Sequence, residues 1–291
     1  MFLTIKNEHL TVSVDSVGAQ LMNILGADGT EYLWQGDEAY WADRSPLLFP
    51  FVARLTNNSY RLDGKVYPMQ IHGFARRARF FLLDSNDTSV KLLLMSTEET
   101  KAAYPFDFSL RVTYALEGAS LKITYAVENK SEKTMPFGIG GHPGFRVPLV
   151  EGERFEDYYL EFSQPCEPDR VGFTPEVYLS GCDERYPLED GVRIPLHHDL
   201  FNEDAIVLKN MAKEVSLLSR VSGRGLRVSY PQMPYIGFWH RPESDAPYVC
   251  IEPWSTLPSR QGVVEDFGCK SDMIRLAPGE TYENNWSVTI F

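Results

Sequence analysis

The sequence predicts an all-β fold, a large antiparallel sandwich with few short helices. Apolar and polar residues alternate with period two in segment after segment, as in strands that bury one face. Turn sequences separate these segments: DGT, DGK, EGAS, KSEK, SGRG and APGE. The strand–helix rhythm of a parallel sheet is absent, as are repeats and low-complexity linkers. We therefore expect residues 1–291 to form one domain.

The alternating segments extend from the first residues to the last. They are FLTIK (2–6), LTVSV (10–14), SVKLLLMS (89–96), FSLRVTYAL (108–116), SLKITYAVEN (120–129), LRVSY (226–230), YIGFW (235–239), YVCIE (248–252) and NWSVTIF (285–291). Residues 108–129 are predicted to form a hairpin with EGA at its tip. A single β domain of this length needs many strands, and we expect more than about fifteen.

Helical signals are few. Residues 96–105 allow one short helix, with Ser96 as its cap, Glu99 in the capping-box position and Pro105 beyond its end. Residues 255–267 are expected to hold another helical turn or two. Residues 140–190 are rich in Pro, Gly and acidic residues and are predicted to form long loops over one face of the sandwich, where functional residues tend to lie.

Composition and charge limit the binding partners and the cellular location that are expected for the protein. The net charge of −12 argues against a duplex nucleic acid or an anionic membrane as partner. No apolar run reaches the ~20 residues of a membrane span, and the first residues alternate and carry charge, unlike a signal peptide. A cytoplasmic location is therefore expected, with Cys166, Cys182, Cys250 and Cys269 as reduced thiols. A Cys166–Cys182 disulfide is the alternative.

Two of the six histidines have unusual neighbours. His72, in QIHGFAR, and His142, in GGHPGF, are each followed by Gly or Pro-Gly and then Phe. Glycine beside a side chain lets another group approach the backbone closely, which favours a functional residue; a histidine that caps a loop is the alternative. His9, His197 and His198 are interpreted as surface residues.

A carboxylate and an arginine stand at the ends of apolar runs. Glu252, in YVCIEPWSTLPS, faces the same way as Tyr248 and Cys250 if the strand alternates. It is either a general base held on a rigid strand or a solvated residue at the rim. Arg54, in FPFVARLTNNSY, is expected to make a fixed contact with a ligand or a buried structural salt bridge.

Two further interpretations follow from charge and donor type. Arg76, Arg77 and Arg79, in HGFARRAR, form a basic group that is either a solvated face or a phosphate site. His72, His142 and Glu252 could form a two-histidine, one-carboxylate metal set, but their spacing is not diagnostic and no metal is expected. Nucleotide-binding loops and the G-x-S-x-G nucleophile motif are absent.

Taken in order, several of these stretches resemble the aldose 1-epimerase (galactose mutarotase-like) superfamily. They are VARLTNNSYRLDGKVYPM, IHGFAR, GGHPGF, YIGFW and CIEPW, so the resemblance covers nearly the whole chain. The most specific are the Arg-x(5)-Tyr-x-x-Asp-Gly-Lys run at 54–65 and the glutamate after Val-Cys-Ile. The chain looks most like the LacX-type branch of galactose-mutarotase-related proteins, and the resemblance implies a β-supersandwich.

The resemblance also implies roles for five residues. It makes His142 the general acid and Glu252 the general base of anomer interconversion, and it makes Arg54, His72 and Asp204 sugar ligands. The implied reaction opens and recloses the ring of a hexose without a metal or an organic cofactor. The partner is a small sugar, and the protein is a monomer or a homodimer.

The acid–base assignment carries an expectation about charge. A protonated histidine and an ionised glutamate must coexist, so a modest upward shift of the pKa of His142, supplied partly by Glu252, is expected. Trp239 and Trp254 could stack on the apolar face of the sugar or be core aromatics.

The chain departs from better-known mutarotases at Ala53, Pro143, Pro253 and Trp254. These changes keep the acid and the base and leave the choice of sugar open. Two alternatives therefore stand beside a hexose mutarotase. One is a hexose-6-phosphate mutarotase that holds phosphate with Arg76 and Arg77, and the other is a non-catalytic sugar-binding protein on the same fold.

Overall fold

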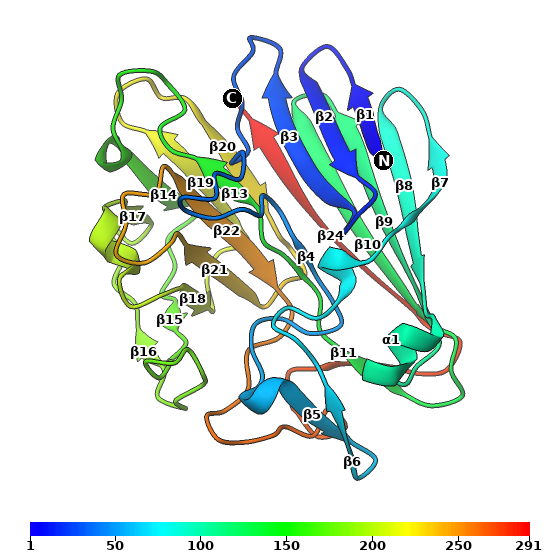
Figure 1. Cartoon of the computed structure of the whole chain (residues 1–291). Helices are drawn as coiled ribbons and strands as arrows, with labels where there is room; N and C mark the ends of the chain where they lie inside the picture. The colour runs from blue at the N-terminus through cyan, green and yellow to red at the C-terminus, as the bar shows by residue number, and fades with distance from the viewer.

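Two large antiparallel sheets make up most of the molecule (Figure 1). The computed structural model describes residues 1–291, which form 24 strands and one α-helix. The predicted all-β class and the expectation of more than fifteen strands are confirmed. That residues 1–291 form one domain stays a prediction.

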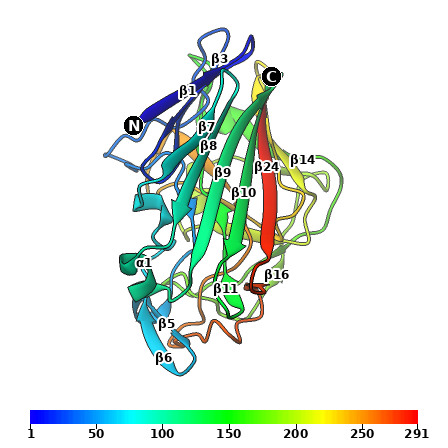
Figure 2. The ribbon, with the colours of Figure 1, turned by 90° about the vertical axis from the view of Figure 1, so that its right-hand side faces the viewer.

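The larger sheet has nine strands and carries the predicted hairpin (Figure 2). In spatial order it contains β17 (Arg193–Pro195), β14 (Tyr158–Phe162), β19 (Glu214–Ser219), β20 (Gly225–Ser229), β24 (Thr281–Ile290), β10 (Ser120–Asn129), β9 (Phe108–Glu117), β8 (Ser89–Met95) and β7 (Phe81–Ser85). Strands β9 and β10 pair from Glu117↔Ser120 outward, so Gly118 and Ala119 make the turn. Gly118 has φ +58°, a conformation in which glycine is favoured.

The second sheet has eight strands and carries the chemistry-bearing segments. It contains β16 (Glu184–Arg185), β15 (Asp169–Arg170), β18 (Ile206–Lys209), β21 (Tyr235–Trp239), β22 (Tyr248–Trp254), β12 (Gly140–Gly141) and β4 (Leu47–Leu48), with β13 (Gly144–Arg146) also paired to β22. Strand β22 is buried on both faces. Val249 and Ile251 belong to the main core, whereas Tyr248, Cys250 and Trp254 belong to smaller clusters.

Three small sheets and a few helical turns complete the fold. The sheets are β1 (Phe2–Lys6), β2 (Leu10–Asp15) and β3 (Gln20–Gly26); β5 (Ser59–Leu62) and β6 (Lys65–Pro68); and β11 (Met135–Phe137) and β23 (Ile274–Leu276). The 3₁₀ turns are Thr56–Asn58, Ala75–Arg77, Phe155–Asp157 and His198–Phe201, and the helix is α1 (Glu98–Ala103).

The expected helix forms, but the prediction of its N-cap residue was wrong by one position. Thr97, not Ser96, caps α1, and Thr100, not Glu99, completes the capping box. Ser96 is still paired with β9, since its N–H donates to the carbonyl of Phe108 at 3.0 Å. Its hydroxyl also binds this side of the sheet, accepting from the N–H of Phe108 at 3.3 Å and donating to Asp107 at 3.1 Å, so it does not cap the helix.

The helical turns expected in residues 255–267 were also wrong, because this segment contains no helix. Its polar groups bind elsewhere: the N–H of Leu257 donates to Asp272 at 2.7 Å, and the N–H of Ser259 donates to the carbonyl of Arg54 at 3.0 Å. All four cysteines are free, so the Cys166–Cys182 disulfide is not formed. No helix is long and apolar enough to cross a membrane.

The main core lies between the two large sheets. One cluster of 63 buried residues draws side chains from Ile5 to Val288. Phe162 of the nine-stranded sheet meets Phe238 of the eight-stranded sheet, with ring centroids 6.3 Å apart. Full burial of a large apolar side chain contributes about 1.5–3 kcal/mol, so this interface fixes the eight-stranded sheet as a rigid base. The other face of that sheet is left for a site.

Candidate active site

A cavity of about 240 Å³ opens where loops cover the outer face of the eight-stranded sheet. Seven of the residues singled out in the sequence line it, and they come from six separate segments. They are Arg54, His72, Arg76, His142, Asp204, Trp239 and Glu252. Phe173 and Val177, from the predicted loop region 140–190, also line the cavity. The fold thus gathers residues that are far apart in the chain into one small-molecule-sized space.

The sheet register places His142 opposite Glu252. Gly140 pairs with Trp254 and Gly144 pairs with Cys250, so the residue midway between the two glycines faces Glu252 across the strands. His142 Nε2 lies 3.2 Å from Glu252 Oε2. Both side chains are buried, Glu252 to 1% exposure. A rigid strand pair therefore aligns an imidazole and a carboxyl.

Pro143 interrupts this strand without separating the pair. Its carbonyl accepts a hydrogen bond from the N–H of Ile251 at 3.1 Å, but it has no N–H with which to make the reciprocal bond. The N–H of His142 points the other way, to the carbonyl of Pro46 at 3.1 Å. One lost ladder bond divides the segment into β12 and β13 and leaves His142 between them.

The glycines around His142 make room for tryptophans rather than for a ligand. A Cβ on Gly141 would lie 2.8 Å from Trp286, and one on Gly144 would lie 3.1 Å from both Trp34 and Trp41. A Cβ on Gly140 would meet the carbonyl of Pro253 at 2.8 Å. The interpretation that glycine here admits a ligand to His142 was wrong. Gly141 is required by close packing against the nine-stranded sheet, whereas Gly140 makes room for the neighbouring strand β22 and Gly144 for two loop tryptophans.

Gly141→Ala is therefore expected to destabilise the protein by about 1–3 kcal/mol, because the new methyl group overpacks buried Trp286. Urea unfolding measures the change. Gly237→Ala, on strand β21 of the same sheet, is the matched control, since its Cβ would meet nothing closer than 3.4 Å. Equal unfolding free energies for the two variants would contradict this packing explanation.

Hydrogen bonds fix the orientation of His72. Its ring Nδ1 accepts a hydrogen bond from the backbone N–H of Ala53 at 3.1 Å. The backbone N–H of His72 donates to the carbonyl of Ala53 at 2.9 Å. Both residues have positive φ, 66° and 61°. Burial, followed by the charges of His142 and Arg76, holds the pKa of His72 well below its usual range. His72 is therefore a neutral imidazole whose Nε2–H is free to donate.

Arg54 and Asp204 lie on the cavity wall. An Arg54 guanidinium N–H donates to the carbonyl of Glu176 at 2.8 Å, and the group lies 5.9 Å from the ring centroid of Tyr178. It makes no ion pair, so the alternative of a buried structural salt bridge was wrong. Asp204, at φ +73°, accepts a hydrogen bond from the N–H of Ala205 at 2.7 Å. Both side chains keep further polar atoms for a ligand.

The basic group at 76–79 is bound by an acid that the sequence did not single out. Asp43 accepts two hydrogen bonds from Arg77, at 2.8 and 3.0 Å, and one from Arg76 at 3.5 Å. Of the two arginines, only Arg76 lines the cavity, and the Arg77 side chain is 63% exposed. One carboxylate thus partly neutralises the charge of Arg76 and Arg77. Neither sequence-based interpretation of the group, a solvated face or a phosphate site, included this carboxylate.

Tryptophans form the apolar wall. Trp41 stacks on His142 with ring centroids 4.9 Å apart, and Trp239 meets His142 edge-on at 5.7 Å. Trp254 lines the same cavity and is 4% exposed. Sequence reasoning did not select Trp41, because it lies in the irregular segment 36–45, where no periodicity marks it. Its stacking on His142 and its place in the cavity wall identify it.

Burial favours the uncharged form of each member of the pair. Desolvation, followed by the charge of Asp204, raises the pKa of Glu252 well above its usual range. Desolvation also lowers the pKa of His142 to about 3. The expected upward shift of His142 was therefore wrong: the charge of Glu252 that would supply it is itself suppressed by burial. When the pair carries one proton, the carboxyl therefore holds it.

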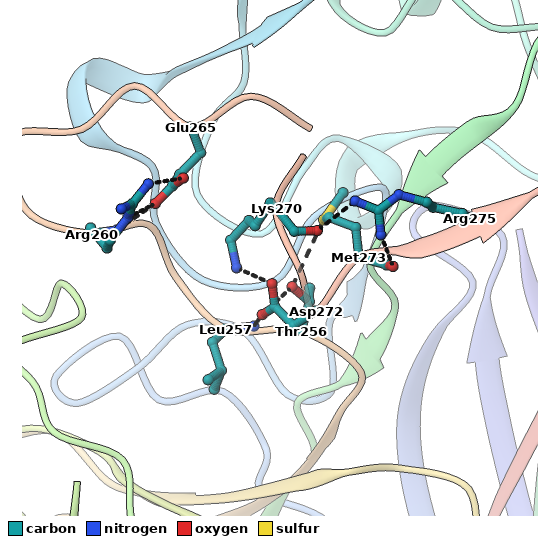
Figure 3. A network of polar contacts seen from close by, with 8 residues as sticks. All are labelled: Thr256, Leu257, Arg260, Glu265, Lys270, Asp272, Met273 and Arg275. Carbon is teal, nitrogen blue, oxygen red and sulfur yellow. Dashed lines mark hydrogen bonds and ion pairs between the residues drawn. The ribbon is translucent and has the colours of Figure 1, made fainter. Parts of the chain in front are cut away.

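A polar network supports the segment that follows Glu252 (Figure 3). Asp272 accepts hydrogen bonds from the Oγ of Thr256 at 2.8 Å and from the N–H of Leu257, and it pairs with the ammonium of buried Lys270. Ser255 binds Ile139, which comes directly before strand β12, and its Oγ accepts from the N–H of Ile139 at 2.7 Å. Both arms of the pair are thereby anchored outside the cavity.

The fold and the cavity define a β-sandwich protein with a small-molecule cavity that holds a buried carboxyl–imidazole pair. A family model described as "Aldose 1-epimerase" matches residues 1–289. Protein LacX (chromosomal) of Lactococcus lactis subsp. lactis is 37% identical over 301 residues, which cover 100% of this chain and 99% of LacX. The chain belongs to the aldose 1-epimerase family.

Solved structures agree with this membership. A galactose mutarotase related enzyme from Lactobacillus acidophilus superposes with a TM-score of 0.96 at 34% identity, covering 100% of this chain and 97% of that one. A galactose mutarotase-like protein from Lactobacillus casei ATCC 334 gives a TM-score of 0.93 at 32% identity and covers both chains completely. The predicted β-supersandwich of the galactose mutarotase type is confirmed.

Proposed function

We propose that this protein is an aldose 1-epimerase that interconverts the α and β anomers of a free hexose. The observation that carries the proposal is the His142–Glu252 contact of 3.2 Å inside the cavity. Glu252 Oε2 and His142 Nδ1 have no hydrogen-bond partner although both are buried. Buried polar atoms without hydrogen-bond partners are rare, and a bound substrate would supply the missing partners.

In the proposed reaction Glu252 and His142 move two protons in opposite directions. The Glu252 carboxylate takes the proton of the anomeric hydroxyl, and protonated His142 gives a proton to the ring oxygen as the C1–O5 bond breaks. The C1 aldehyde rotates, and closure on its other face reverses both transfers. The neutral pair of protonated Glu252 and neutral His142 has the same number of protons as this ion pair. Transfer of one proton from Glu252 to His142 therefore converts the neutral pair into the reactive ion pair.

The remaining residues of the cavity would hold the sugar. His72 Nε2–H and the Arg54 guanidinium donate to hydroxyl groups, Asp204 accepts from them, and Trp239 supplies an apolar surface for one ring face. A free hexose is preferred over a hexose 6-phosphate because Asp43 already binds Arg76 and Arg77. A phosphate would have to compete with that carboxylate.

Polarimetry on freshly dissolved α-glucose, α-galactose and glucose 6-phosphate tests the function. Catalysed decay of optical rotation is expected for a free hexose, with a smaller effect on the phosphorylated sugar. Faster decay for glucose 6-phosphate that is lost in Arg76→Ala would instead support the phosphosugar alternative. Sugar binding by calorimetry without any rate enhancement would select the non-catalytic alternative.

The pH dependence of kcat/KM follows from the proton count of the pair. Because burial lowers the pKa of His142 to about 3, the acid limb of the profile is expected below the usual histidine value of about 6.5. Because burial raises the pKa of Glu252, the alkaline limb is expected above the usual carboxyl range. Polarimetric rates across the pH range measure the profile, and an acid limb centred at or above about 6.5 would contradict this electrostatic description.

A further inference from the structure

Cys250 adds a third donor beside the carboxyl–imidazole pair. It lies two residues before Glu252 on β22, on the same face of the strand, and is fully buried. The sulfur packs in a small cluster with Trp34 and Tyr248, against which Trp41 and Trp239 lie. Cys250 Sγ, a His142 ring nitrogen and a Glu252 carboxylate oxygen all lie within 4.8 Å of one another. The acid–base steps proposed above do not use this thiol.

The donor set is one that a divalent metal ion of borderline softness accepts. Zinc binds thiolate sulfur at about 2.3 Å, imidazole nitrogen at about 2.0–2.1 Å and carboxylate oxygen at about 2.0–2.2 Å, and it takes three protein ligands plus one open position in many sites. The three donor atoms, within 4.8 Å of one another, must draw together around an ion to reach such distances. The cavity that His142 and Glu252 line supplies the open position. Magnesium and calcium prefer oxygen ligands and do not suit a thiol and an imidazole.

The unpartnered atoms of the pair point to the same conclusion. Glu252 Oε2 is buried without a hydrogen-bond partner and faces His142 Nε2 at 3.2 Å. A cation between them would contact both atoms, and coordination would replace the proton of the pair and the thiol proton by the metal. This set differs from the His72, His142 and Glu252 set considered from the sequence, because His72 Nδ1 is already bound by Ala53.

We propose an inhibitory site for Zn²⁺ and similar divalent cations of borderline softness, formed by His142, Cys250 and Glu252. Metal binding ties up both groups that move protons, so it blocks turnover in competition with the sugar. The inhibition rests on the proposed function, whereas metal binding itself does not.

Cobalt absorption tests the site without any activity assay. The starting protein is a Cys166→Ser/Cys182→Ser/Cys269→Ser variant, in which Cys250 is the only thiol. Titration with Co²⁺ is expected to give a thiolate-to-cobalt charge-transfer band in the near ultraviolet. The band should disappear when Cys250→Ser or Cys250→Ala is added, with folding of each variant checked by circular dichroism. No band, or a band that persists without Cys250, overturns the site.

Inhibition is then measured by polarimetry on the full-length protein. Zn²⁺ is expected to suppress catalysed mutarotation, EDTA to restore it, and Mg²⁺ to have no effect. Loss of a partner that only orients a metal ligand typically costs about 10–100-fold in metal affinity. Cys250→Ser removes a direct ligand, so, compared with its own metal-free rate, it should need at least about that much more Zn²⁺ for half-inhibition. Unchanged zinc sensitivity in Cys250→Ser contradicts the inhibitory role. If the protein shows no mutarotation at all, the proposed function fails while the cobalt titration still decides the metal site.

Discussion

Glu252→Gln is expected to lower kcat for mutarotation by about 10²–10⁴-fold, the usual contribution of one positioned acid or base. The amide has nearly the same shape as the carboxyl but cannot take the anomeric proton. KM should change much less, because His72, Arg54 and Asp204 still line the cavity. Initial rates by polarimetry over a range of sugar concentrations separate the two constants.

The folded state of this variant should be unaffected or more stable at neutral pH. The pKa of Glu252 is raised on folding, so its stabilising contribution is complete below the unfolded value and is lost as pH rises through the folded one. Glutamine does not ionise and removes that loss. Glu283→Gln, at an exposed position of strand β24, is the matched control and should keep full activity. Wild-type kcat in Glu252→Gln would show that another group is the base.

His142→Gln is expected to reduce kcat by a similar factor of about 10²–10⁴. The amide can still donate a hydrogen bond to the ring oxygen, but it cannot deliver a proton as the C1–O5 bond breaks. The packing of Trp41 on the ring, at 4.9 Å, is lost as well, so unfolding in urea is measured alongside the rate. His9→Gln, at an exposed position, is the control and should match wild type. A rate close to wild type in folded His142→Gln would exclude His142 as the acid.

The pattern of the strands and the motifs predicted the architecture because strand periodicity is a local property. The hairpin at 108–129 formed with its turn at the predicted place, since Gly118 and the alternation on both sides are all local signals. The cap of α1 was wrong because Ser96 is held by Phe108, a contact with another strand. Local sequence contains no information about that partner.

In the candidate site, too, local motifs were predictable and contacts between distant segments were not. His142 and Glu252 were selected from their motifs, and the register of β12, β13 and β22 puts them face to face. Their protonation could not be predicted, because it depends on burial beneath side chains such as Trp41, which comes from an irregular loop. Asp43 was likewise missed as a partner, since the arginines that it binds are distant in sequence. Cys250, the proposed third metal ligand, was missed because it meets His142 only across the paired strands.

The double variant Glu252→Gln/His142→Gln tests most directly whether the pair works as one acid–base unit. Residues that act together in catalysis lose activity non-additively. Comparison of kcat for the two single variants and the double variant by polarimetry is therefore expected to show a double variant about as slow as the slower single one. If the two losses instead multiply, Glu252 and His142 act independently, and the central claim is contradicted.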